Sequence, residues 1–116
     1  MVDFQKLLIW QKSHQLTLEI YLVTKKFPKE EKYGLIGQMR RSSSGIPTNI
    51  AEGSARNTQM DFKRYLTIAL SSNAELRYQI ILSKDLEYIS VDEFHTLIQL
   101  SEEVQRMIYA YAEKLK

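Results

Sequence analysis

Residues 40–56, RRSSSGIPTNIAEGSAR, contain two of the chain's four glycines and one of its two prolines. Both residue types disfavour the interior of a helix. Apolar and small residues nevertheless recur through this region at helical steps of 4, 3, 4 and 4: Leu35, Met39, Ser42, Ile46 and Ile50. The spacing therefore predicts one helix over about residues 29–53, kinked at Pro47 and not ended there.

Pro47 has a predictable local consequence. It cannot donate a backbone hydrogen bond to the Ser43 carbonyl four residues earlier, so we expect the neighbouring serine hydroxyls to hydrate or re-pair the bent turn. The segment Ser42–Gly45 has almost no side-chain bulk, which predicts close approach by another helix. Gly53 is predicted to cap the end of this helix.

The first helix is predicted over about residues 8–26. Its buried face is marked by apolar residues at steps of 7, 4, 3 and 4: Ile9, Leu16, Ile20, Val23 and Phe27. A second stripe runs beside the first: Leu7, Trp10, His14, Leu18 and Tyr21. One stripe is enough for an ordinary surface helix, and soluble monomers rarely expose large apolar patches. The second stripe therefore predicts self-association.

Two further helices are predicted to begin at capping boxes. Thr58 precedes Asp61 by three residues, and Ser90 precedes Glu93 by the same interval. Apolar residues follow each box at heptad-like spacing, and no segment alternates as a strand would. Four helices with short connections predict an all-α, antiparallel up-down four-helix bundle, which occupies residues 1–116 as a single domain.

The composition limits the classes of function. The chain has no cysteine, its N-terminus lacks the pattern of a signal peptide, and no window approaches the apolar length of a membrane span. A cytoplasmic location without membrane contact is expected. The net charge of +2 is uneven, since residues 1–64 have 11 Lys and Arg against 6 Asp and Glu. This asymmetry permits either a polyanion on the basic half or head-to-tail docking of a second copy.

The acidic residues do not predict a metal site. Each predicted helix has a glutamate, but none belongs to the Glu-x-x-His pairs of di-metal bundles: Glu19, Glu52, Glu75 and Glu102. Neither a metal nor another cofactor is expected. Glu52 and Glu75 are expected to be paired at helix contacts, with Arg40 and Arg41 as available partners. Asn49 is likewise expected to have a structural role.

Three features leave alternatives open. His14 is expected to be a packed, hydrogen-bonded core histidine, because no nucleophile or oriented acid stands near it in the sequence. The loop of residues 52–58 could hold a phosphate through Gly53, Ser54 and Arg56, or it could simply join two helix caps. Four tyrosines could stack on bases, or pack in the core or a subunit interface: Tyr65, Tyr78, Tyr109 and Tyr111.

The stretch at residues 40–53 has an arginine pair, small residues and then Ile-Pro-x-Asn-Ile-Ala-Glu-Gly. Together with LIWQKSHQLTLEIY (8–21) and DFKRYLTIALSSNAEL (61–76), it resembles the family of 23S rRNA intervening-sequence proteins over nearly the whole chain. The motif positions that the resemblance carries over are Arg40, Arg41, Pro47, Asn49, Glu52 and Gly53. Asn73 and Ala74 depart from a commoner pair of small residues.

The resemblance implies a bundle that assembles into a ring, commonly a pentamer, and that is often encoded within large-subunit ribosomal RNA genes. A related family, the accessory variability determinants of diversity-generating retroelements, is similar in fold and is associated with nucleic acid and a reverse transcriptase. The resemblance supplies no settled activity.

From the residues and the resemblance together, we expect a non-enzymatic homo-oligomer whose basic half binds the backbone of RNA or DNA. The expected contact residues are Lys25, Lys26, Lys29, Lys32, Arg56, Lys63 and Arg64. No zinc-finger, RNA-recognition or helix-turn-helix signature is visible, so such binding is expected to be electrostatic and weakly sequence-specific. The alternative is an assembly or adaptor protein that acts through protein–protein contacts.

Overall fold

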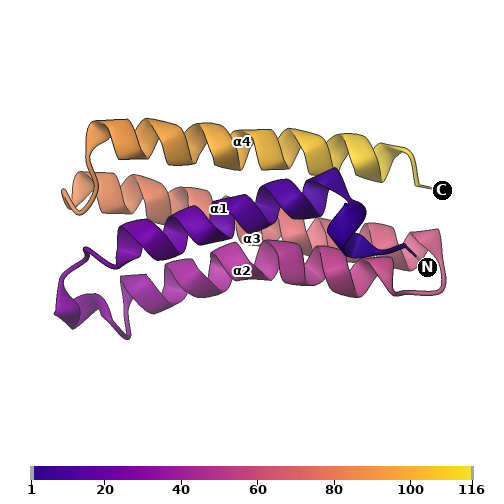
Figure 1. The fold of residues 1–116 in the computed structure, drawn as a ribbon, viewed down its shortest axis with the longest axis horizontal. Helices are drawn as coiled ribbons and strands as arrows, with labels where there is room; N and C mark the ends of the chain where they lie inside the picture. Colours follow the sequence, from indigo (N-terminus) through magenta and orange to yellow (C-terminus); the bar gives the residue numbers. More distant parts are fainter. Residues whose placement is uncertain (1, 116) are drawn as a thin grey trace.

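A computed structural model describes residues 2–115, which form four long helices and two short 3-10 helices, η1 and η2. Their bounds are η1 Phe4–Lys6, α1 Leu8–Thr24, η2 Lys29–Glu31, α2 Leu35–Ser54, α3 Gln59–Asp85 and α4 Val91–Glu113. Successive long helices run in opposite directions along a body of 43 × 24 × 20 Å (Figure 1). The predicted all-α four-helix bundle is confirmed.

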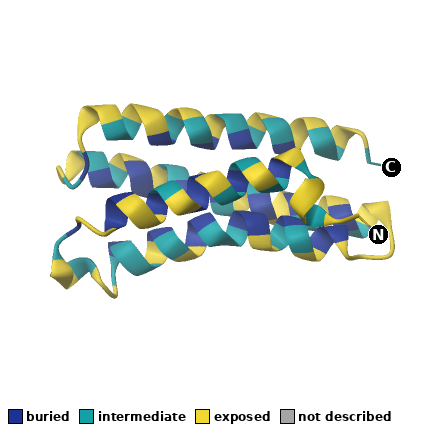
Figure 2. Ribbon diagram, in the orientation of Figure 1, coloured by how far each residue is buried: buried dark blue, intermediate teal, exposed yellow. Residues whose placement is uncertain are grey.

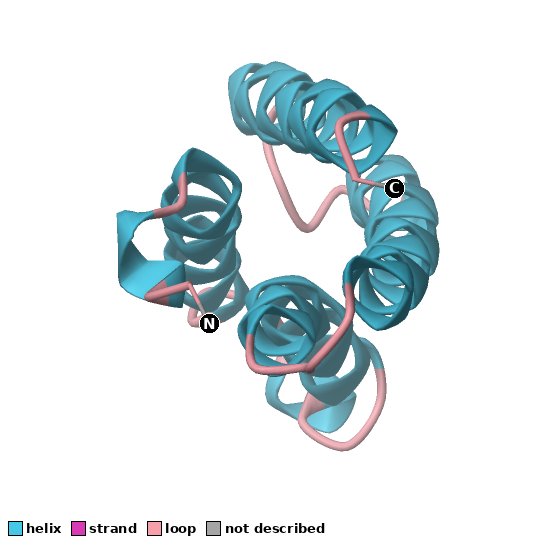
Figure 3. Cartoon of the chain, turned by 90° about the vertical axis from the view of Figure 1, so that its right-hand side faces the viewer, coloured by secondary structure: helices cyan, strands magenta, loops and turns pink. Residues whose placement is uncertain are grey.

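Each long helix packs against its two neighbours around the bundle, so α1 and α3 occupy diagonal corners (Figure 3). The residues that meet along the central axis are buried (Figure 2). The largest fully buried apolar side chains are Leu16, Ile20, Met39, Ile46, Ile50, Leu66, Leu76, Ile80, Leu97, Val104 and Ile108. The first predicted stripe of α1 belongs to this core, whereas the second stripe lies at the surface.

The start of α2 differs from the prediction, because the helix begins at Leu35 and not near residue 29. Pro28 does precede a helical turn, but this turn is the short η2. Gly34, with φ −107° and ψ −113°, then departs from the helical conformation and separates η2 from α2. The Glu31 carboxylate accepts a hydrogen bond from the Leu35 amide at 3.1 Å and so satisfies one free donor of the new helix. The first helix also ends earlier than predicted, at Thr24.

The second helix continues through Pro47, as its spacing predicted. The serine hydroxyls do not re-pair the carbonyl that Pro47 leaves free, because Ser43 and Ser44 donate to the carbonyls three residues before them and Ser42 donates to α3. The free Ser43 carbonyl instead accepts a hydrogen bond from Thr17 Oγ1 of α1 at 2.9 Å. This hydroxyl also lies 3.0 Å from the Ser13 carbonyl. The missing backbone bond is thus replaced by a contact between two helices.

Small residues bring α2 close to α3. Ser42 is buried and donates a hydrogen bond to Gln79 Oε1 of α3 at 2.6 Å. A Cβ added at Gly45 would lie 3.2 Å from Ser72 Oγ. The predicted helix contact over Ser42–Gly45 is therefore confirmed.

The predicted cap at Gly53 is wrong. Gly53 lies inside the helix without a positive φ, and the C-cap is Ala55. A Cβ at Gly53 would lie 2.7 Å from Tyr65 Cβ and 2.8 Å from Phe62 Cδ1, both on α3. The glycine is required by close packing between helices and not by a left-handed turn.

Both predicted N-caps are present. Thr58 Oγ1 accepts a hydrogen bond from the Asp61 amide at 3.1 Å, and Ser90 with Glu93 forms a full capping box.

A pair of hydrogen bonds joins α3 to α4 inside the core. Asn73 Nδ2 donates to the Ser101 carbonyl at 2.9 Å, and Ser101 Oγ donates to Asn73 Oδ1 at 2.8 Å. All polar atoms of the Asn73 side chain thereby have partners although the residue is buried.

Candidate nucleic-acid interface

The seven predicted contact residues are all exposed, but they lie at opposite ends of the bundle. Four surround the connection between α1 and α2 and form the lysine cluster: Lys25, Lys26, Lys29 and Lys32. Three surround the connection between α2 and α3 and form the mixed cluster: Arg56, Lys63 and Arg64. The two connections are separated by the length of α2, about 30 Å at 1.5 Å per residue (Figure 1). One chain therefore presents two basic surfaces.

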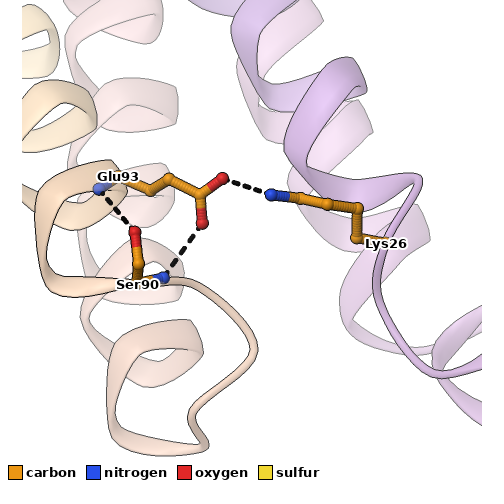
Figure 4. A network of polar contacts seen from close by, with 3 residues as sticks. All are labelled: Lys26, Ser90 and Glu93. Atoms are coloured by element: carbon orange, nitrogen blue, oxygen red, sulfur yellow. Dashed lines mark hydrogen bonds and ion pairs between the residues drawn. The ribbon is translucent and has the colours of Figure 1, made fainter.

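Part of the charge of the lysine cluster is neutralised. Lys26 forms an ion pair with Glu93 at the start of α4 (Figure 4). Lys32 Nζ lies 5.4 Å from the centre of the Tyr33 ring, which is a cation–π contact. Lys25 and Lys29 form no ion pair within residues 2–115. These two lysines keep their full charge for an external anion.

The mixed cluster shares a single acid. Asp61 Oδ2 lies 3.7 Å from Arg56 Nε, and Asp61 Oδ1 lies 3.2 Å from Arg64 Nη2. The Arg56 guanidinium also lies 5.8 Å from the centre of the Tyr65 ring. Lys63 is exposed and is in no ion pair of the described chain. The cluster remains positively charged after these pairings.

The ion pair of Lys26 is built onto the capping box of α4 (Figure 4). The Glu93 carboxylate accepts from Lys26 Nζ through Oε2 and from the Ser90 amide through Oε1 at 2.9 Å. The hydrogen bond from Lys26 and that from the Ser90 amide lower the pKa of Glu93. This contact ties the end of α1 to the start of α4.

A second polar contact lies at the same end of the bundle. Tyr88, which follows α3, donates a hydrogen bond to Glu31 Oε2 at 2.9 Å, and its ring lies 5.1 Å from that of Phe27. The hydrogen bond to the Glu31 carboxylate favours the protonated phenol and raises the pKa of Tyr88. The two connecting segments at this end are therefore held against each other.

The expected pairing of the motif arginines with glutamates is wrong. Arg40 lies across the end of α1, where its Nε donates to Thr24 Oγ1 at 3.0 Å and its guanidinium lies 4.6 Å from the centre of the Tyr21 ring. A cation there is favoured by the negative end of the helix dipole. Arg41 is exposed and unpaired within residues 2–115.

Glu52 and Glu75 are exposed as well, and no ion pair of the described chain includes them. The helix phase explains Glu52: it follows the buried Ile50 by two residues, which is more than half a turn. Asn49 is half-buried and donates a hydrogen bond to the Gly45 carbonyl at 2.7 Å, within its own helix.

The second stripe of α1, apart from Leu7, lines an apolar groove of about 520 Å³ between α1 and α2. His14 is stacked on Trp10, with ring centres 4.8 Å apart and planes 13° apart, and Leu18 and Tyr21 are 53% and 40% exposed. The expectation of a core histidine is therefore wrong, since His14 is a half-buried groove residue. The groove is an apolar surface that one chain leaves open.

Exposure separates the four tyrosines. Tyr78 and Tyr109 are 62% and 54% exposed, whereas Tyr65 and Tyr111 are half-buried. At the end of α2, where the predicted loop of residues 52–58 begins, Ser54 is buried and donates a hydrogen bond to the Ala51 carbonyl at 2.8 Å. With Gly53 packed against α3 and Arg56 paired with Asp61, this loop forms a helix connection and not an open phosphate cradle.

Within residues 2–115 no three acidic or histidine side chains are gathered where they could hold a metal ion. None of the helices described there has the length and apolar character needed to cross a bilayer. Sequence reasoning also missed one polar position in the helix contacts, Thr17. The heptad spacing of α3 places Asn73 in phase with the apolar residues Leu66, Ala69 and Leu76, and its burial confirms this position.

These features define an all-helical bundle with a basic surface at each end. The model of the 23S rRNA-intervening sequence protein family matches residues 5–110, so the chain belongs to this family. The bundle is similar to the crystal structure of a protein of unknown function from the S23 ribosomal protein family of Bacteroides thetaiotaomicron. The TM-score is 0.82 at 23% sequence identity, and the match covers 92% of this chain and 100% of the other. At this identity the likeness concerns the fold. No curated protein sequence matches the chain.

Proposed function

We propose that the protein is a non-enzymatic homo-oligomer that binds the backbone of RNA or DNA through its exposed basic residues. The observation that carries this proposal is the set of exposed lysines without an acid partner in the described chain: Lys25, Lys29 and Lys63. Such side chains can neutralise phosphates and release counterions at little structural cost. Membership of a family associated with 23S ribosomal RNA supports the choice of nucleic acid as the polyanion.

Self-association is supported by apolar surface on two diagonal corners of the bundle. The exposed apolar residues of α1 include Leu18 and Leu22, which is 57% exposed, and α3 exposes Ile68. A contact between α1 of one copy and α3 of the next covers both surfaces, and a repeated head-to-tail contact closes into a ring when the rotation between copies divides a full turn. The family resemblance supports a ring of five copies.

A ring would also combine the separated clusters. Cyclic symmetry places the same end of every copy on the same rim, so the lysine clusters of all copies would face one side. A modest attraction per copy is then multiplied by multivalent binding of one nucleic-acid chain.

Filter binding over a series of salt concentrations tests the nucleic-acid part. The variant Lys25→Glu/Lys29→Glu leaves the Lys26–Glu93 pair intact, and Lys6→Glu/Lys114→Glu is a control with the same change in charge outside both clusters. We expect the first variant to reduce the slope of log K against log salt by about 0.7 to 0.9 for each lost phosphate contact. Equal slopes in the two variants, or no binding by the unmodified protein at low salt, would contradict the proposal.

The groove between α1 and α2 favours a second candidate, an adaptor that binds another protein. Light scattering of the unmodified protein tests the homo-oligomer first, because a mass near the 13.6 kDa of one chain would exclude it. We expect Leu18→Asp to dissociate the oligomer and Gln99→Asp, on the exposed side of α4, to leave it intact. Loss of nucleic-acid binding together with a monomeric protein would leave the adaptor as the better description.

A further inference from the structure

A groove of about 300 Å³ with a mixed polar and apolar lining lies between α3 and α4. On α3 it is lined by Thr67, Leu70, Ser71, Ala74 and Arg77, and on α4 by Gln105 and Tyr109. None of its lining residues is acidic. Figure 3 shows the two helices at adjacent corners of the bundle.

The guanidinium of Arg77 is incompletely satisfied. Its Nη2 donates a hydrogen bond to Gln105 Oε1, which is a neutral acceptor. Its Nε is buried and has no hydrogen-bond partner within residues 2–115. No acid forms an ion pair with Arg77 in the same part of the chain.

This environment distinguishes Arg77 from the other half-buried arginine. Arg40 lies over the Tyr21 ring and at the negative end of α1, so its charge is compensated. The buried Nε of Arg77 has lost water without gaining a hydrogen-bond partner, and the guanidinium contacts no opposite charge in the described chain. An anion in the groove would supply that charge, and arginine is well suited to phosphate recognition.

The other lining residues indicate which anion fits. Ser71 offers an exposed hydroxyl, and the exposed Tyr109 ring offers an apolar face on which a base can stack. Lys63 precedes Thr67 by about one helical turn on the same side of α3. Thr67 Oγ1 donates a hydrogen bond to the Lys63 carbonyl at 3.2 Å. From Lys63 to Arg77 the helix rises by about 21 Å, so a basic residue lies at each end of this side of α3.

We propose that the groove between α3 and α4 binds a single strand of nucleic acid, with a phosphate at Arg77 and a base stacked on Tyr109. This inference rests on the proposed function, and it names a base-stacking site that the exposed lysines alone do not provide. Because the contacts are to phosphate and to the face of a base, the site accepts different sequences.

Fluorescence anisotropy with a labelled oligouridine and a labelled oligothymidine tests the site. Arg77→Gln is compared with Arg106→Gln, which removes an exposed arginine of α4 outside the groove. We expect Arg77→Gln to reduce the salt slope by about 0.7 for the lost phosphate contact, and Arg106→Gln to leave it unchanged. Circular dichroism and light scattering check that each variant keeps its fold and mass.

Tyr109 provides a second variant that does not depend on the stability of Arg77→Gln, since its ring is 54% exposed. We expect Tyr109→Leu to weaken binding about tenfold and Tyr109→Phe, which keeps the ring, to bind as the unmodified protein does. If the unmodified protein binds but all four variants bind alike, the groove is not the site and the proposed function stands. If it binds neither oligonucleotide at low salt, both proposals fail. Binding of inorganic phosphate at Arg77 with no effect of Tyr109→Leu on oligonucleotides would overturn the assignment to a nucleic-acid strand.

Discussion

The two faces of α2 make different kinds of contact with their neighbours. Toward α3 the helix presents glycines, and the backbones approach until no Cβ fits at Gly53. Toward α1 it presents a backbone carbonyl, at Ser43, which Pro47 has freed to accept from Thr17. The contact with α3 therefore depends on the absence of a side chain at Gly53, and the contact with α1 depends on a hydrogen bond. The glycines and the proline of one motif therefore serve two unrelated purposes.

The largest effect on the free energy of unfolding is expected at the close contact between α2 and α3. Gly53→Ala places a methyl group 2.7 Å from Tyr65 Cβ, a rigid atom, so the helices must separate. We expect a loss of about 2 kcal/mol in the free energy of unfolding, after the helix preference of alanine is included. Gly45→Ala is the matched control, because its nearest neighbour is the Ser72 hydroxyl at 3.2 Å, which can rotate. Equal losses in urea denaturation of the two variants would break the distinction between the two glycines.

The next effect concerns the other face. Thr17→Val removes the donor to the buried Ser43 carbonyl, and we expect a loss of about 1.5 kcal/mol. In a Pro47→Ala background the backbone amide of residue 47 can donate to that carbonyl, so the same substitution should cost less. A double-mutant cycle measures this coupling. Additive losses would show that Thr17 stabilises the contact by some other means.

A smaller effect lies at the contact of α1 with α4, which neither face of α2 forms. The pKa of Glu93 is lowered in the folded protein, so folding favours its ionised form. Its contribution is present above the ordinary pKa of 4.5 and is lost as the pH falls through the lowered value. We expect Glu93→Gln to lose less than about 1 kcal/mol near neutral pH and to flatten the decline of the melting temperature in acid. Identical pH profiles for the two proteins would contradict this assignment.

The smallest effect is expected at Glu52, on the side of α2 away from the core. Its side chain is exposed and pairs with no cation in the described chain, so Glu52→Ala should change the free energy of unfolding by no more than about 0.5 kcal/mol. Thermal denaturation at neutral pH measures this change. A drop as large as that of Thr17→Val would mean that Glu52 has a partner in the folded assembly.

Local chemistry made much of the fold predictable. The N-caps at Thr58 and Ser90 depend on residues three positions apart, and both are present. The continuity of α2 through Pro47 followed from apolar spacing on either side of it. The role of Gly53 was not predictable in this way, because a glycine that caps a helix and a glycine that packs against another helix can occupy the same position near a helix end. Only the position of Tyr65 on another helix separates the two.

The candidate site was less accessible to sequence reasoning. The seven basic residues are all exposed, but their separation into two ends follows only once α2 is placed between the two connections. The exposure of Glu52 could have been inferred from its phase relative to Ile46 and Ile50. Arg77 gave no signal, because its orphaned Nε results from the way α4 packs against α3.

The composition of α2 has a consequence for the order in which the chain becomes structured. Of its 20 residues, three are glycine, one is proline and four are serine, so its intrinsic preference for a helix is low. The 27 residues of α3 include neither glycine nor proline. During synthesis α2 is completed before α3, against which it packs most closely. We therefore expect α2 not to form a stable helix during synthesis until α3 has also been made.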